Sequence, residues 1–133
     1  MESSNQLDDL FVFIASSADS CLKPWKHSVI NSKENIFSPR EENEDIDLTL
    51  KIECRDKLGI RHPENDLELE IYKSGSELNI ILAKYDQKDQ PILWQGNHPV
   101  WMNGSNGTRC KAPDNGMSLE ALARKLRSLV IAL

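Results

Sequence analysis

The sequence has few of the residues that mark disulfide-rich or metal-binding proteins. Its cysteines are Cys21, Cys54 and Cys110, an odd number with no CxxC pair, which fits neither a disulfide framework nor a zinc module. The three histidines are scattered singly, so none has a partner at metal-ligand spacing on a helix. We therefore predict no metal and no cofactor, and we expect the cysteines to be reduced thiols in a cytoplasmic protein.

Long apolar runs and an excess of positive charge are also missing. No stretch reaches the roughly 18 apolar residues that a membrane-spanning helix needs, so we expect no membrane association. The apolar residues 10–15 follow Asp8 and Asp9 with no Lys or Arg before them, the reverse of an export signal. The net charge of −5 disfavours nucleic acid as a partner, because an acidic surface repels phosphate backbones.

Motifs for catalysis are absent in the same way. Ser74-Gly75-Ser76 lacks the spacing of a nucleophile elbow, and the glycines near Thr108 are not followed by the lysine of a phosphate-binding loop. His98 and Cys110 are close enough in sequence to form a thiol–imidazole pair in a folded chain. No catalytic residues are predicted from these patterns.

The length and composition, in contrast, are those of an ordinary globular protein. A chain of 133 residues, 39% hydrophobic and 28% charged, is the size of a single domain spanning residues 1–133. Residues 31–45 are polar and acidic, and they bury too little apolar surface to offset their ordering entropy. This segment is predicted to be an acidic surface loop or a partly disordered linker.

Helical periodicity occurs near both ends of the chain. The N-terminal apolar stripe consists of Leu7, Leu10, Phe11, Ile14, Ala15, Ala18, Cys21 and Leu22. Pro24 should end this helix, although residues 10–14 are also compatible with a buried strand. The C-terminal stripe consists of Leu119, Leu122, Ala123, Leu126, Leu129, Val130 and Leu133. Ser118 is the expected N-cap of this second, amphipathic helix.

Between the helices the period of the apolar residues changes to two. Apolar and polar residues alternate strictly from Ile46 to Cys54, which is typical of a strand with one face on the core. Further strands are indicated at residues 67–72, 77–85 and 91–95, with shorter pieces at 100–102 and 108–110. We therefore predict an α+β fold: an antiparallel sheet of four or five strands, with an N-terminal helix and a C-terminal amphipathic helix packed on it.

Unusual residue types are concentrated in residues 94–110. Two of the three tryptophans lie there, together with a histidine and an arginine. Tryptophan and arginine are favoured anchors of protein interfaces, so the candidate interaction surface consists of Trp94, His98, Trp101 and Arg109. The alternative is that both tryptophans pack in the core or at its edge, and that the two Asn-Gly pairs only turn the chain.

A resemblance to a family rests on this region. Trp94-Gln95-Gly96, His98 to Trp101, Gly107 to Cys110 and Leu119 to Ala123 resemble small uncharacterised proteins of cyanobacteria. The abundance of Lys, Asn and Ile would suit an AT-rich genome of that group. The resemblance implies no activity and assigns no role to any residue.

Three functions are compatible with these patterns. The first is a small soluble protein-interaction or assembly module without catalytic activity, with a protein as its partner. The second is a small enzyme or ligand binder with a pocket near His98, Arg109 and Cys110. The third is a single-stranded nucleic-acid binder in which Trp94 and Trp101 stack on bases.

Overall fold

The computed structural model of the chain describes residues 2–32, 36–37, 45–87, 92–103, 106–114 and 116–132. The elements are α1 (Glu2–Cys21), β1 (Lys26–Asn31), β2 (Ile36–Phe37), β3 (Ile46–Arg55), β4 (Leu67–Ser74), β5 (Glu77–Lys84), β6 (Leu93–Gln95), β7 (Pro99–Met102), β8 (Arg109–Cys110) and α2 (Met117–Ile131). Two short 3-10 turns, η1 (Pro63–Asn65) and η2 (Tyr85–Gln87), follow β3 and β5. The predicted loop at 31–45 lies largely outside the described residues, but β2 falls within it and pairs with β3.

The described strands form one antiparallel sheet. Seven of them follow the order β1-β3-β4-β5-β6-β7-β8, and β2 is an eighth that pairs with β3 alone. The α+β class is confirmed, whereas the predicted number of four or five strands is wrong. The sequence of β1, Lys-His-Ser-Val-Ile-Asn, shows no alternation of apolar and polar residues, so its pairing with β3 left no signal.

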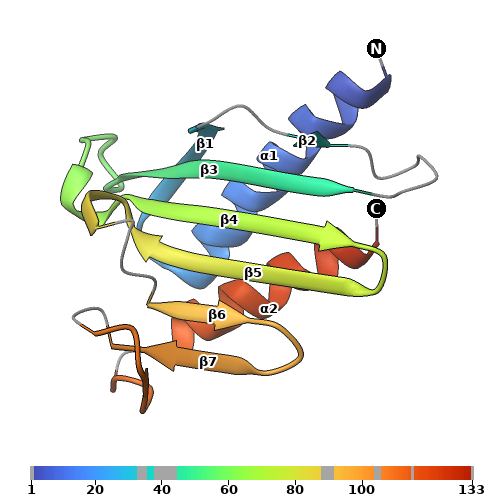
Figure 1. Ribbon diagram of the computed structural model, residues 1–133. Helices are drawn as coiled ribbons and strands as arrows, with labels where there is room; N and C mark the ends of the chain where they lie inside the picture. Colours follow the sequence, from blue (N-terminus) through green and yellow to red (C-terminus); the bar gives the residue numbers. More distant parts are fainter. Residues whose placement is uncertain are drawn as a thin grey trace.

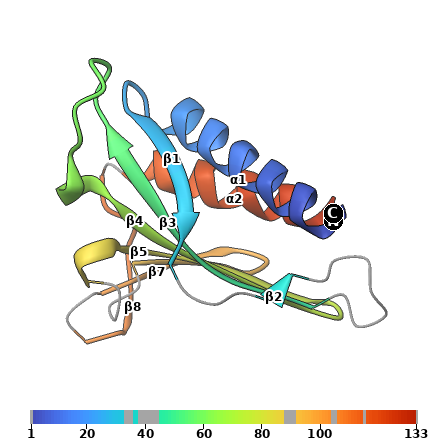
Figure 2. The same ribbon diagram turned by 90° about the horizontal axis from the view of Figure 1, so that it is seen from above.

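The two predicted helices both pack on the sheet, and they lie on the same face of it (Figures 1 and 2). They run antiparallel to each other, with α1 against β1 and α2 against β5 and β6. Alternate residues of β3, among them Leu48, Leu50 and Ile52, point to the helices and are fully buried. The opposite face of the sheet carries the polar residues of the same alternation, and no helix of the described residues lies over it.

Residues 10–14 belong to the helix α1 and are not a strand, and their burial follows the helical period. Leu10 and Ile14, four residues apart, are buried, whereas Val12 and Phe13 between them are exposed. The helix therefore keeps a buried stripe even though its solvent side is partly apolar. No helix among the described residues is both long and apolar enough to span a bilayer.

The start of α2 differs from the prediction. Gly116 occupies the N-cap position without a side-chain hydrogen bond, so Ser118 is not the cap. A Cβ on Gly116 would lie 2.7 Å from Cζ2 of Trp101 and 3.1 Å from the carbonyl oxygen of Pro113. Because the chain passes this close to the Trp101 ring, only glycine fits there, and the helix begins one residue later at Met117.

Candidate functional site

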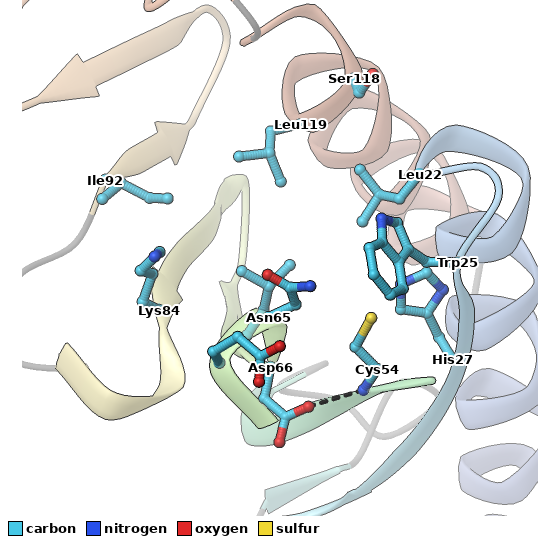
Figure 3. Close-up of a pocket in the computed structure, with 12 residues that line it drawn as sticks. Leu22, Trp25, His27, Cys54, Asn65, Asp66, Lys84, Ile92, Ser118 and Leu119 are labelled. Carbon is cyan, nitrogen blue, oxygen red and sulfur yellow. Dashed lines mark hydrogen bonds between the residues drawn. The ribbon is translucent and has the colours of Figure 1, made fainter. Parts of the chain in front are cut away.

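A pocket of about 240 Å³ opens at the end of the sheet where β3 ends and β4 begins. It is called the end pocket below. Figure 3 shows its lining, which comes from the α1–β1 link, β1, β3, η1, β4, β5 and the first turn of α2. The lining residues are Leu22, Trp25, His27, Cys54, Glu64, Asn65, Asp66, Leu67, Lys84, Ile92, Ser118 and Leu119.

The thiol of Cys54 belongs to this lining but is not activated. Cys54 is 2% exposed, and burial raises the pKa of its thiol above the ordinary value. The negative charge of Asp66 raises it further, against a smaller opposing effect of Arg61. A cysteine nucleophile needs the opposite shift, towards the thiolate. The environment therefore keeps Cys54 as a neutral thiol.

His27 lies beside Cys54 and is held by α1. The two residues are paired across β1 and β3, and the Nδ1 atom of His27 is 3.0 Å from the Oδ1 atom of Asp19. An Asp–His–Cys order is reminiscent of nucleophilic catalysis. Yet the hydrogen bonds found among the described residues include none between His27 and the Cys54 sulfur. The Asp19–His27 contact thus ties β1 to α1.

At the edge of the end pocket, the side chain of Asp66 supplies the hydrogen-bond acceptor that a neighbouring strand would otherwise provide. The last residue pair between β3 and β4 is Ile52 with Leu67, so β3 extends beyond its partner. There the backbone N–H of Cys54 donates to the Asp66 carboxylate at 2.8 Å. Arg61 donates to both oxygens of the same carboxylate, at 2.8 and 2.7 Å.

These contacts decide the charge of Asp66, which is only 3% exposed. Burial alone would raise the pKa of this carboxyl, but the hydrogen bonds from Arg61 and Cys54, with the charges of Arg61 and Lys51, hold it below its usual value. A buried carboxylate that is paired in this way is a structural group. It is not free to act as a general acid near neutral pH.

His62 fastens the neighbouring loop to the wall of the pocket. Its ring nitrogens lie 2.9 Å from an oxygen of Asp56 and 3.1 Å from one of Glu64. The hydrogen bond to Asp56, followed by that to Glu64, raises the pKa of His62. The imidazole also meets the ring of Trp25 edge-on, with centroids 4.9 Å apart. The loop and the α1–β1 link are therefore joined by a single side chain.

The end pocket thus offers a mainly apolar interior. Its buried carboxylate, Asp66, is already paired. The apolar and aromatic part of its lining consists of Leu22, Trp25, Leu67, Ile92 and Leu119, and Figure 3 labels all of these but Leu67. Among the described residues, no group of three His, Cys, Asp or Glu side chains is placed to hold a metal ion. Such an arrangement suits the uptake of an apolar group.

The four residues of the predicted surface do not share one face. Trp94 and Arg109 are exposed, and strand alternation places both on the sheet face without helices. Trp101, 7% exposed, points to α2 and donates from Nε1 to a carboxylate oxygen of Glu120 at 2.5 Å. His98 lies in the bend between β6 and β7. The structure therefore assigns Trp101 to the core, the alternative stated for both tryptophans, and Trp94 to the surface.

His98 lines a different pocket from the one predicted. Its neighbours there are Arg124 and Arg127 of α2, and the described lining includes neither Arg109 nor Cys110. The end pocket itself was missed from the sequence. Trp25, the one tryptophan outside residues 94–110, was its only sign, since its other residues are spread over most of the chain.

Comparison with known proteins identifies the family. Residues 11–129 match the family described as Domain of unknown function (DUF8659), and the chain belongs to it. The predicted resemblance to an uncharacterised family is thereby confirmed, while a cyanobacterial origin stays a prediction. No curated protein and no solved structure matches the chain.

Proposed function

We propose that this member of the DUF8659 family is a protein-interaction module without catalytic activity, and that its end pocket accepts one apolar side chain of a protein partner. The size of the pocket together with its lining carries the proposal. A volume of about 240 Å³ is below the roughly 300–1,000 Å³ of pockets for small molecules. It suits a single large side chain better than a whole ligand.

The state of the polar groups supports binding over catalysis. The thiol of Cys54 is kept neutral, and the negative charge of the Asp66 carboxylate is balanced by Arg61. His62 is held between Asp56 and Glu64. Asp66 and His62 thus have structural partners and the Cys54 thiol is uncharged. An incoming apolar group therefore contacts a mainly apolar lining, and its burial is favourable by about 25 cal/mol per Å².

Exposed apolar residues at the same end of the molecule support a protein as the partner. Met117, next to the lining residue Ser118, is 81% exposed, and Leu58, in the loop after β3, is 80% exposed. Ile60 of the same loop is 58% exposed. Exposed apolar side chains at the same end as an apolar pocket favour a protein partner, because contacts beside an anchor residue exclude water from it.

Trp94 supports a second contact on the uncovered sheet face. It is 42% exposed, and its Nε1 atom donates to Oδ1 of Asn79 at 2.9 Å, which fixes the ring. An indole held in place loses little conformational entropy when a partner covers it. Trp94 thus stays in the proposal, together with Arg109 on the same face, while Trp101 does not.

The experiment is a titration with N-acetyl-leucinamide, which mimics one apolar side chain, followed by NMR of the indole N–H signals. The chain has only three tryptophans, and Trp25 alone lines the end pocket. We expect the Trp25 signal to shift and to saturate with a Kd of about 1 mM, as the ligand's size suggests. The signals of Trp94 and Trp101 should stay in place.

Two variants of α2 form a matched pair for this titration. Ser118→Trp places a large ring at the pocket and should abolish the response of Trp25, because the ring occupies the space. Ala121→Trp, also exposed on α2 but outside the lining, should leave the response unchanged. The proposal would be contradicted if N-acetyl-leucinamide left the chemical shift of the Trp25 indole N–H unchanged. It would also be contradicted if N-acetyl-glycinamide shifted this signal equally.

A further inference from the structure

A second pocket, of about 470 Å³, lies between the β6–β7 bend and α2. It is called the hairpin pocket below. Asn97 and His98 contribute from the bend, Gln95 from the end of β6, and Arg124 and Arg127 from α2. It shares no lining residue with the end pocket. Its volume is within the range of small-molecule sites.

The charge of the hairpin pocket is opposite to that of the chain. The net charge is −5, yet the described lining of this pocket holds two arginines and a histidine and no Asp or Glu. Arg124 is partly compensated, since its Nη2 atom lies 3.2 Å from a carboxylate oxygen of Glu120. The same Glu120 carboxylate also accepts the hydrogen bond of Trp101, so it is shared between Arg124 and Trp101.

Arg127 has no such compensation. Its Nη2 atom donates to the neutral amide oxygen of Asn97 at 3.2 Å, and within the described residues no carboxylate pairs with it. Arg124 and Arg127 are three residues apart on α2, at neighbouring positions of one side of the helix. In the structure they face the bend that carries His98. The arginines therefore have a place in a concave site.

Two buried polar atoms of the lining lack hydrogen-bond partners among the described residues. They are Nε of Arg127, a donor, and Oε1 of Gln95, an acceptor. Gln95 is only 2% exposed. Leaving a buried polar group unsatisfied costs about 1–3 kcal/mol, so each such group in a native protein calls for an explanation, such as a bound ligand or water. Both atoms belong to residues of the same pocket. The Arg127 donor is complementary to an acceptor oxygen of a ligand, whereas the Gln95 acceptor requires a donor such as a hydroxyl group.

From these observations we infer that the hairpin pocket binds the phosphate group of a small phosphorylated molecule. A phosphate offers several acceptor oxygens and up to two negative charges, and the planar guanidinium groups of Arg124 and Arg127 can bind it through paired hydrogen bonds. The side chains of His98 and Asn97 add N–H donors. A volume of about 470 Å³ leaves room for the organic part of the ligand beside its phosphate.

The inference is tested by titrating the full chain with inorganic phosphate and with methyl phosphate, at constant ionic strength in a buffer free of phosphate. Binding is followed by NMR of the Gln95 side-chain amide and of the Arg127 Nε–H. We expect saturable shifts of both signals, with methyl phosphate binding at least as tightly as inorganic phosphate. Exclusion of methyl phosphate would overturn the inference, as would acetate producing the same shifts at the same concentrations.

Charge-removing variants locate the site. Arg127→Gln and Arg124→Gln should each weaken phosphate binding about tenfold or more, because a charge-assisted hydrogen bond is lost. Lys125→Gln removes an equal charge from an exposed position of α2 outside the lining and should leave binding unchanged. Equal weakening by Lys125→Gln would show a general electrostatic effect and would overturn the inference. Arg124, 61% exposed, keeps the test decisive if Arg127→Gln impairs folding.

Discussion

Trp94 and Trp101 have opposite environments although only six residues separate them. In the β6–β7 hairpin, Leu93 pairs with Trp101 and Trp94 pairs with Val100. Paired residues share a face of the sheet, so Trp101 joins Leu93 against the helices while Trp94 points away. Their closeness in sequence suggested that the two rings share one surface. The alternation of side chains along β6 and β7 instead places them on opposite faces of the sheet.

At the scale of these residues, the two alanine variants should differ in stability. Trp101→Ala should lower the free energy of unfolding by about 3–5 kcal/mol, because a buried ring and its hydrogen bond to Glu120 are removed. Trp94→Ala should cost less than about 1 kcal/mol. Urea denaturation followed by circular dichroism measures both, and equal losses would mean that the assignment of faces is wrong.

His62 offers a second test at the residue scale. Because Asp56 and Glu64 raise its pKa, protonated His62 supports its loop below about pH 6.5, and this support is lost as the pH rises through the raised value. NMR titration of the imidazole should give a midpoint above 6.5. Asp56→Asn keeps the oxygen that accepts from Leu58 and Ile60 but loses the charge, and it should lower the midpoint. An unchanged midpoint would contradict the assigned cause.

At the scale of elements, the sequence predicted those whose pattern is self-contained. Strict alternation indicated a strand from Ile46 to Cys54, and the structure has β3 from Ile46 to Arg55. Both helices were predicted from their apolar stripes. Strand β1 was missed, because its burial comes from its position between β3 and α1 and not from a pattern of its own.

The two pockets could not be predicted because they combine distant elements. Cys54, Lys84 and Leu119 line the end pocket from β3, β5 and α2. Nothing in their local sequence indicates that these segments converge, since strand order depends on the packing of the whole chain. The sequence suggested a pocket near His98, Arg109 and Cys110, but in the structure His98 lines a pocket with Arg124 and Arg127, which come from an element about 30 residues away.

The close contact between Trp101 of β7 and Gly116 at the start of α2 leads to a prediction about how these elements pack. Gly116→Ala should destabilise the fold by about 1–3 kcal/mol, because the added Cβ would overlap the Trp101 ring and the Pro113 backbone. Gly96→Ala is the control, since its Cβ would meet only Oδ1 of Asn79 at an ordinary 3.5 Å. Thermal unfolding of the two variants compares them, and a Gly116→Ala variant as stable as wild type would refute the close contact.

On the scale of the whole molecule, an apolar layer between sheet and helices is supplemented by an ion pair at one end. The core residues of α1, α2 and the sheet form one continuous cluster. Beyond it, where β3 extends past β4, cohesion depends on Asp66 and Arg61. The stability of the entire fold is therefore linked to the charge of a single carboxylate.

This linkage predicts how the protein responds to acid. The pKa of Asp66 is lowered in the folded state, so its contribution is complete above the unfolded value of about 3.9 and is lost as the pH falls through the folded value. Asp66→Asn should lower stability by about 3 kcal/mol near pH 7 and flatten its decline below about pH 4. Urea unfolding from pH 3 to 7 measures this, and parallel curves for variant and wild type would disprove it.

The bond from the Cys54 amide to Asp66 also has a consequence for exchange with solvent. Amide protons in the strand ladder exchange with deuterium only when the backbone hydrogen bonds between strands open. The Cys54 amide proton is instead protected by its hydrogen bond to the Asp66 carboxylate, a group that can itself be protonated. Protection of the Cys54 amide should accordingly decrease when Asp66 is protonated, because the acceptor loses its charge, while its neighbours within the β3 ladder keep their protection. One backbone position thus reports the ionisation of a buried carboxyl.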